Sequence, residues 1–437
     1  MKLKYLLILF LLPILLISSC KREEDRIFDT NATVRITEAV QNAYTVLQGN
    51  KAGWMMKFYP SKNQEFGGYT IFTKFISNEK VSIASDPIAG VETSSYAVVA
   101  ESGPVLTFNG YNKSIHWFSE PGMDNGGVVG DGGIGPDDSG MQGDFEFIVL
   151  KATADSVVLK GKKTGSHLVM LPLKNEEFES LSKTYQEATN KFNQFLVYKL
   201  ETPGSEVVNL DFDPRYRVFS NPNDQATGTM SFRVIPGALE FYKEYIIEGK
   251  SFDRLNYVQP TSAYPNGYYT DKSNAIKIVP ATAPLNIWFR NNLWSMSYSN
   301  TGPTGKIYWD RAKTALKTNG IVVNNAFIGK LTSNIGLIYV LQNGAVVGGV
   351  SHFIDPVKGT EDQIYIELEG YVIGNFPIAY WTGGINNITT PFNGRTFKIT
   401  SDGTPNPTAL TLTDIGIPTN TYKVFLKDIN DPFNNQG

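Results

Sequence analysis

Hydrophobic and polar residues alternate along most of the chain, which is the pattern of β-strands with one buried face. In one such run, Phe145, Phe147 and Val149 are expected on one face, with Asp144 and Glu146 on the other. Turn-forming sequences separate the runs, so we predict an antiparallel meander that closes into a lipocalin-like barrel. The predicted strands cover residues 54–59, 68–76, 80–84, 96–100, 105–109, 115–118, 144–151, 156–162 and 167–171.

Three segments instead show hydrophobic residues at spacings of three and four, which indicates helices with one apolar face. Asn31 is a suitable N-cap for the first helix and Gly49 a suitable end, while Thr304 is expected to cap the third. Each apolar face needs a surface to cover, so we expect the helices to pack against the sheets. The predicted helices cover residues 33–48, 175–196 and 304–319.

Strand patterns resume after residues 202–205, a turn-forming sequence that predicts a linker. Asn343 and Gly344 predict a tight hairpin turn in this half. The chain is therefore predicted to be mostly β, with two domains of antiparallel meander sheet and a few packing helices. Residues 33–200 would form a helix and a barrel closed by a second helix, and residues 205–437 a second β-rich domain. The later predicted strands cover residues 229–235, 238–242, 245–248, 337–342, 346–353, 364–369, 397–400, 409–413 and 422–426.

The N-terminus has the features of a bacterial lipoprotein signal. A positively charged start precedes an apolar run over residues 6–17, which is too short to span a bilayer, where roughly 20 residues are needed. The sequence Ile-Ser-Ser-Cys that follows resembles the site at which such signals are cut in front of a lipid-modified cysteine. We predict that residues 1–19 are a signal peptide and that Cys20 carries a lipid anchor in the outer membrane.

Residues 20–32 are predicted to be a charged tether between the lipid and the folded chain. Its sequence Lys-Arg-Glu-Glu-Asp at 21–25 resembles the acidic signal of lipoproteins that are exported to the cell surface. The same charges also fit a plain solvated tether. Cys20 is the single cysteine of the chain, so no disulfide is expected.

Composition and charge narrow the possible partners. The net charge of −3 becomes −5 when Lys2 and Lys4 leave with the signal peptide. The sequence also has no cluster of basic residues, so nucleic acid is not expected as a partner. The 40 glycines, 23 prolines and 12% aromatic residues fit a β protein with many turns.

No motif in the chain predicts catalysis, a metal or a cofactor. His116, His167 and His352 are isolated in strand-like sequence, and their spacing fits no structural zinc site. Phosphate-binding and serine-hydrolase motifs are absent from the sequence. Residues 124–140 are rich in Asp and Gly, which suits either a calcium loop or a plain connector.

Two pairs of carboxylates have a spacing that acid–base chemistry can use. Glu367 and Glu369, like Asp144 and Glu146, lie two apart in predicted strands, which separates them by roughly 6.5–7 Å. That separation falls in the range of inverting glycosidases. The commoner arrangement with this spacing is the solvated face of a strand, and we favour it for both pairs.

Aromatic residues are the best candidates for ligand contact. Most of the 6 tryptophans and 22 tyrosines are expected in the core or on sheet faces. Tyr264, Tyr268 and Tyr269 stand out because they lie in a sequence that predicts a loop. If the chain has a stacking platform for a sugar or a peptide, these three tyrosines are its first candidates.

Several short sequences of the first half resemble a known family. They are GWMMKFYP at 53–60, GGY at 67–69, PVLTF at 104–108, YN at 111–112, GDFEF at 143–147 and VLKGKK at 158–163. In these residues the chain is similar to a lipoprotein family of Bacteroidota that shares domain of unknown function 4302. The resemblance implies a surface lipoprotein near outer-membrane import systems, among TonB-dependent receptors and their binding-lipoprotein partners. It implies no known activity.

These observations leave three hypotheses for function. The first is a non-catalytic accessory that binds a glycan or peptide nutrient or docks on an importer. The second is a hydrolase of glycans or peptides with carboxylates from both domains. The third is a carrier of an apolar ligand inside the first barrel. Facing, desolvated carboxylates would favour the hydrolase, and an empty barrel interior would favour the carrier.

Overall fold

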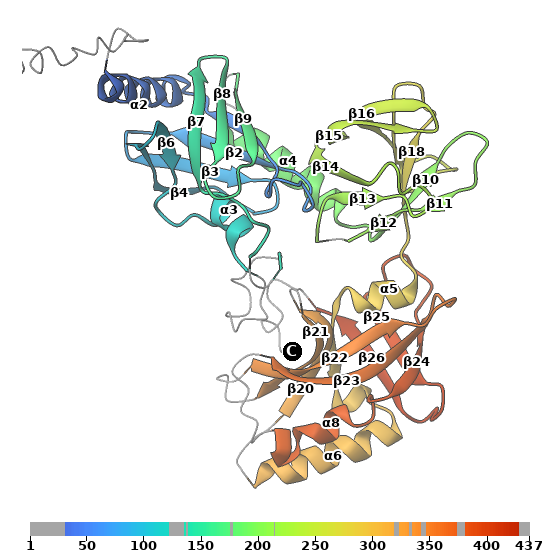
Figure 1. The fold of residues 1–437 in the computed structure, drawn as a ribbon. Helices are drawn as coiled ribbons and strands as arrows, with labels where there is room; N and C mark the ends of the chain where they lie inside the picture. The colour runs from blue at the N-terminus through green and yellow to red at the C-terminus, as the bar shows by residue number, and fades with distance from the viewer. Residues whose placement is uncertain are drawn as a thin grey trace, which may run out of the picture.

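The computed structural model describes residues 31–121, 135–136, 139–174, 178–213, 215–318, 323–331, 334–341, 347–373 and 381–427. In them the chain folds mainly into three antiparallel sheets with few helices (Figure 1), which confirms the predicted fold class. The predicted signal peptide, Cys20 and most of the tether lie outside the described residues. Among the helices of the described part, none is both long and apolar enough to cross a membrane.

The first sheet is a nearly closed barrel. Its strands are β1 (Trp54–Phe58), β2 (Tyr69–Phe75), β3 (Lys80–Ser85), β4 (Glu92–Ser95), β5 (Ala97–Ala100), β6 (Pro104–Thr107), β7 (Glu146–Thr153), β8 (Ser156–Gly161) and β9 (His167–Pro172). Consecutive strands pair with each other, except β4 with β5, and β1 pairs with β9. Only Tyr96 separates β4 from β5, so one segment pairs with β3 through its first half and with β6 through its second.

The second sheet repeats this arrangement. Its strands are β10 (Val197–Glu201), β11 (Val208–Asn209), β12 (Asp211–Phe212), β13 (Val218–Ser220), β14 (Thr229–Ile235), β15 (Ala238–Ile247), β16 (Lys250–Val258), β17 (Tyr268–Thr270) and β18 (Lys277–Ala281). The first strand again pairs with the last, and Leu210 divides the segment that pairs with both β10 and β13. The sequence at 202–205 forms a turn between β10 and β11, where the Ser205 N–H donates to the Thr202 oxygen at 3.3 Å. It therefore lies within this sheet.

The third sheet is a closed barrel. Its strands are β19 (Leu293–Ser297), β20 (Val323–Leu331), β21 (Asn334–Leu341), β22 (Val347–Pro356), β23 (Gln363–Ile373), β24 (Arg395–Thr400), β25 (Ala409–Asp414) and β26 (Thr421–Leu426). Residues 205–437, predicted as one domain, thus contain most of the second sheet and all of the third. The strand pattern predicts where strands lie, but it does not show which strand completes one barrel and which begins the next. The predicted hairpin turn at Asn343 lies outside the described residues, between β21 and β22, which pair with each other.

The longer helices match their predictions in place, with differences at their ends. Helix α2 (Ala32–Gly49) has the predicted cap, because the Asn31 side chain accepts the Val34 N–H at 2.9 Å. Helix α4 (Phe178–Phe192) ends four residues before the predicted end at 196. Helix α6 (Pro303–Lys317) has Pro303 in its first turn and Gly302 at its N-cap, so the predicted Thr304 cap is wrong. A proline suits the first helical position because it has no N–H to satisfy.

Residues 115–118 form no strand, so that prediction is wrong. Helix α3 (Lys113–His116) and a 3₁₀ turn (Trp117–Ser119) occupy this segment. The cause is local, since the Asn112 side chain accepts the Ser114 N–H at 3.0 Å and so begins the helix. The remaining short helices are α5 (Leu285–Arg290), a 3₁₀ turn (Tyr298–Asn300), a π-helical turn η4 (Trp381–Ile385) and α8 (Asn386–Thr389).

Buried side chains form a core cluster in each barrel. In the first, the ring of Phe58 lies 4.8 Å from that of Phe118 and 6.5 Å from that of Phe147, measured between centroids. In the third, Trp294 and the helix residue Trp309 are both buried in one core. Within the described residues the first barrel is therefore occupied by its own core, which does not favour the hypothesis of an apolar carrier.

A buried ionic network joins the first two barrels. Arg217 forms an ion pair with Asp86, and both side chains are almost fully buried. Nearby, Glu240 pairs with Arg233 and accepts from Lys57 Nζ at 2.7 Å. Helix α4 packs against strands of both barrels. The first two barrels therefore share one interface of charged and apolar contacts.

Candidate functional site

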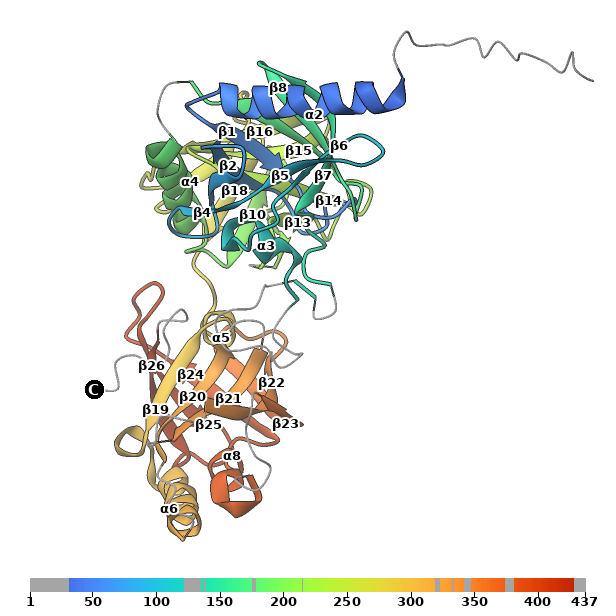
Figure 2. The ribbon, with the colours of Figure 1, turned by 90° about the vertical axis from the view of Figure 1, so that its left-hand side faces the viewer.

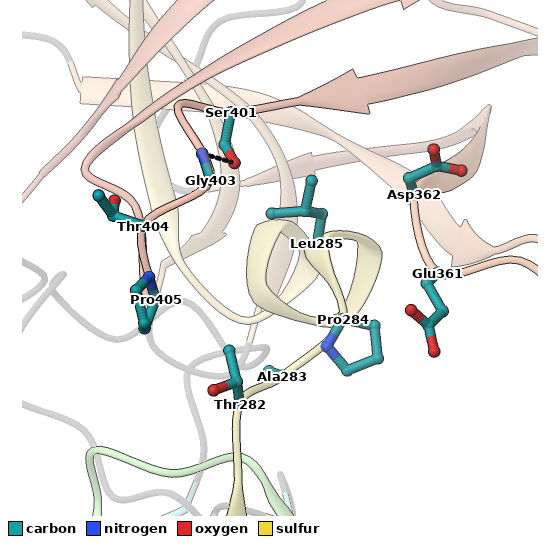
Figure 3. A pocket seen from close by; sticks show the side chains of 10 residues that line it. All are labelled: Thr282, Ala283, Pro284, Leu285, Glu361, Asp362, Ser401, Gly403, Thr404 and Pro405. Atoms are coloured by element: carbon teal, nitrogen blue, oxygen red, sulfur yellow. Dashed lines mark hydrogen bonds between the residues drawn. The ribbon is translucent and has the colours of Figure 1, made fainter. Parts of the chain in front are cut away.

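An open pocket of about 720 Å³ lies at the end of the third barrel beside α5 (Figure 3). It is built from three segments: the connector that follows β18, the loop before β23 and the loop after β24. The lining residues are Thr282, Ala283, Pro284, Leu285, Glu361, Asp362, Ser401, Gly403, Thr404 and Pro405.

Helix α5 holds the two loops of this pocket in place. Asn286 is buried, and its side chain donates to the Thr360 oxygen at 2.8 Å while its N–H donates to the Glu361 oxygen at 3.0 Å. On the other side, Trp288 Nε1 donates to the Pro407 oxygen at 3.1 Å. The pocket walls are thus fixed by hydrogen bonds from one helix turn.

The pocket lining combines apolar and polar side chains. Leu285 lies between the Glu361 side and the Ser401 side of the pocket in Figure 3, so an apolar side chain is flanked by polar groups. Asp362 lies 3.5 Å from Lys398 Nζ, and both are partly exposed. Glu361 is exposed.

Two of the three predicted platform tyrosines lie together, and the third does not. The ring centroids of Tyr264 and Tyr268 are 4.5 Å apart, with Lys277 Nζ 5.0 and 5.2 Å from them. The Tyr264 hydroxyl donates to Glu201 at 2.8 Å. Tyr269 is buried in the core of the second barrel because β17 makes consecutive side chains point to opposite faces. The expectation of a loop at Tyr268 and Tyr269 is thus wrong, and a platform here consists of Tyr264 and Tyr268.

The three histidines lie on different elements. His116 belongs to α3, His167 is exposed on β9, and His352 is buried in the third barrel, where Nδ1 lies 2.9 Å from the Val350 oxygen. Burial lowers the pKa of His352. Among the described residues no three His, Cys, Asp or Glu side chains form a metal-binding group. Most of the Asp- and Gly-rich segment 124–140 lies outside the described residues.

The two predicted carboxylate pairs lie in different surroundings. Asp144 is buried, and it accepts the N–H groups of Lys163 and Thr164 at 2.8 and 3.1 Å, so it holds a turn. The solvated face predicted for Asp144 is therefore wrong. Glu367 and Glu369 are exposed on β23, as expected for a solvated strand face.

Sequence reasoning missed one cluster of aromatic rings on the surface. Tyr111, His116 and Phe145 stack on one another beside α3. The alternation predicts Phe145 inside a strand, but β7 begins one residue later and leaves this ring exposed. The sequence signal for the short helix that carries His116 is Asn112, a good N-cap directly before it.

Comparison with known proteins identifies one family. A family model described as "Domain of unknown function (DUF4302)" matches residues 24–259, a range that contains the first barrel and most of the second. No curated protein matches the chain significantly.

One comparison with solved structures gives a weak likeness. It is to the isotype 1 transferrin binding protein B (TbpB) from serogroup B Neisseria meningitidis, at 7% identity and a TM-score of 0.12. The alignment covers 82% of this chain and 64% of that one, which is less than two thirds of its length. A TM-score this low supports no conclusion about fold or function.

Proposed function

The chain belongs to the family of domain of unknown function DUF4302, and from this starting point we propose that it is a lipid-anchored binding protein of the outer membrane. In this proposal the folded chain is displayed at the cell surface and binds a glycan or peptide nutrient without altering it. A TonB-dependent importer and its binding lipoprotein are the proposed partners.

The pocket beside α5 carries the proposal. It is open, its walls are fixed by Asn286 and Trp288, and it combines an apolar floor with hydroxyl and carboxylate groups. Ligand sites typically have this mixture of apolar surface and a few placed polar groups. Its carboxylates are exposed or ion-paired, which supports binding over hydrolysis.

The lipid anchor rests on the sequence around Cys20. An apolar run precedes the sequence Ile-Ser-Ser-Cys, which resembles a lipoprotein cleavage site. Residues 21–31 then separate the cysteine from the first helix. Stable anchoring in this class of protein depends on more than one acyl chain. The folded part would therefore work while attached to a membrane.

Fatty-acid labelling of intact cells tests the anchor. An alkyne fatty acid is expected to label the wild-type protein and not the Cys20→Ser variant. Protease added to whole cells is expected to degrade the wild-type chain, and cross-linked membranes are expected to yield an importer with it. An unlabelled wild-type chain in the soluble fraction would refute the anchor, and full protection from protease would refute surface display.

The pocket is tested by a substitution that fills it. Thr404→Trp is expected to abolish binding in equilibrium titrations with defined oligosaccharides and short peptides, because the indole occupies the space between the loops. Thr318→Trp is the matched control, since Thr318 is also an exposed threonine but follows α6. Equal binding by the two variants would rule out this pocket as the ligand site.

A further inference from the structure

Three aromatic rings form a continuous stack at the surface of the first barrel. The centroids of His116 and Phe145 are 4.8 Å apart with an interplanar angle of 28°, and those of Tyr111 and His116 are 5.3 Å apart at 31°. The outer rings remain accessible, since Tyr111 is 59% exposed and Phe145 is 38% exposed. Both end residues of the stack are therefore partly open to solvent.

Buried hydrogen bonds hold this stack in place. Asn112 is fully buried, and its side-chain NH2 donates to the Glu92 oxygen at 3.1 Å. Its backbone N–H donates to Nδ1 of His116 at 3.2 Å, which orients the central ring. The Phe145 oxygen accepts the Phe108 N–H at 3.0 Å. The rings are thus ordered before any ligand arrives, which lowers the entropy lost on binding.

The chemistry of the stack points to a carbohydrate ring. An aromatic face held open to water attracts a flat surface of C–H groups, and a sugar ring has such a surface with hydroxyl groups around its edge. Polar groups lie next to the stack, because Glu92 accepts the Lys113 N–H at 3.0 Å, and the Glu92 side chain is exposed while Lys113 is partly exposed. We infer that Tyr111, His116 and Phe145 form a stacking platform for a hexose or pentose unit of a polysaccharide.

The arrangement favours a sugar over a proline-rich peptide. Peptides of that kind bind in grooves between separate aromatic side chains, whereas these three rings form a single stack. The platform is also distinct from the pocket beside α5, since α3 lies on the first barrel, at the end nearer to the third (Figures 1 and 2). The inference rests on the proposed binding role and names a ligand class for it.

Affinity electrophoresis of the mature full-length chain in gels containing soluble starch, xylan or galactomannan tests the platform. The wild type is expected to be retarded by at least one of the three. Tyr111→Ala and Phe145→Ala are each expected to weaken binding on the order of tenfold, because each removes one stacking face. Tyr111→Phe is expected to keep the affinity, since stacking needs the ring and not the hydroxyl.

Tyr242→Ala is the matched control, because Tyr242 is 45% exposed and lies on β15 of the second barrel. It is expected to bind like the wild type, and circular dichroism checks that every variant is folded. Wild-type binding to none of the three polysaccharides, binding to a proline-rich peptide instead, or unchanged binding by both alanine variants would overturn the inference. Fatty-acid labelling and importer co-purification report on the proposed function separately, so the two can fail independently.

Discussion

Single charged side chains carry much of the contact between the first two barrels. Arg217 and Asp86 are 5% and 1% exposed, and Arg217 also donates to the Gly68 oxygen at 3.1 Å. Its guanidinium lies 4.4 Å from the centre of the Tyr69 ring. Removal of one partner from such a pair leaves a buried charge without compensation.

Asp86→Ala is therefore expected to lower the free energy of unfolding by about 3–5 kcal/mol, measured by urea denaturation. Arg215→Ala is the control, because Arg215 pairs with Asp213 where both side chains are 38% exposed. Exposed pairs contribute about 0–1 kcal/mol. Equal losses in the two variants would contradict the role given to the buried pair.

A second prediction at this scale concerns pH. Burial lowers the pKa of His352 in the folded protein, while hydrogen bonding to Val350 and the charge of Glu369 oppose the shift. The unfolded chain takes up this proton near pH 6.5, so it binds more protons than the folded chain below neutrality. Stability is then expected to fall as the pH drops from 7 towards 5.

His352→Leu is expected to remove part of that loss, because no imidazole remains to be protonated after unfolding. The measurement is the free energy of unfolding of both proteins between pH 5 and pH 8. The difference between variant and wild type should grow as the pH falls. A difference that stays constant over this range would show that His352 does not contribute.

At the scale of elements, the sequence predicts features that depend on local chemistry and misses those that depend on distant partners. Each end of α2 is decided locally. The Asn31 cap depends on residues of the first turn, and the end at Gly49 depends on residues of the last turn. The division of β4 from β5 at Tyr96 depends on pairing with β3 and β6, which local alternation does not encode. The same limit applies to the candidate pocket, whose loops are far apart in the chain.

Local patterns also mislead where two of them overlap. Ile115 and Trp117 are apolar residues two apart, as in a strand, but the preceding Asn112 begins a helix there. Tyr269 looks like a loop residue beside Tyr268, yet β17 turns it into the core. A cap hydrogen bond decides the first case, and strand pairing with β16 and β18 decides the second.

A glycine at the junction of the first two barrels gives a prediction for one element. Gly68 forms a bridge with Arg233 of β14, and a Cβ at this position would collide with the Tyr59 ring and the Arg233 side chain. Gly68→Ala is expected to lower the free energy of unfolding by about 1–3 kcal/mol, as for other overpacked sites. Thermal denaturation measures this loss. Gly103→Ala is the control, because a Cβ at Gly103 would meet no atom within 4 Å.

At the scale of the whole molecule, the three barrels are not equally connected. The first two share buried ion pairs and helix α4, while residues 282–284 lead from β18 into the third, which has its own closed ring of strands. We expect the first two barrels to unfold together and the third separately.

Differential scanning calorimetry of the full chain is therefore expected to show two transitions. Asp86→Ala should lower the midpoint of one by on the order of 10 °C and leave the other in place. A single transition that shifts as a whole in this variant would show that all three barrels unfold as one unit.

The division of β4 from β5 at Tyr96 has a consequence for aggregation between copies of the chain. Strands at the border of a sheet offer free N–H and C=O groups to neighbouring molecules, and such borders promote aggregation. In the first barrel these borders are β4 and β5, of four residues each, too short to template a long intermolecular sheet. Copies of this chain at high concentration would thus be protected from polymerising through this barrel.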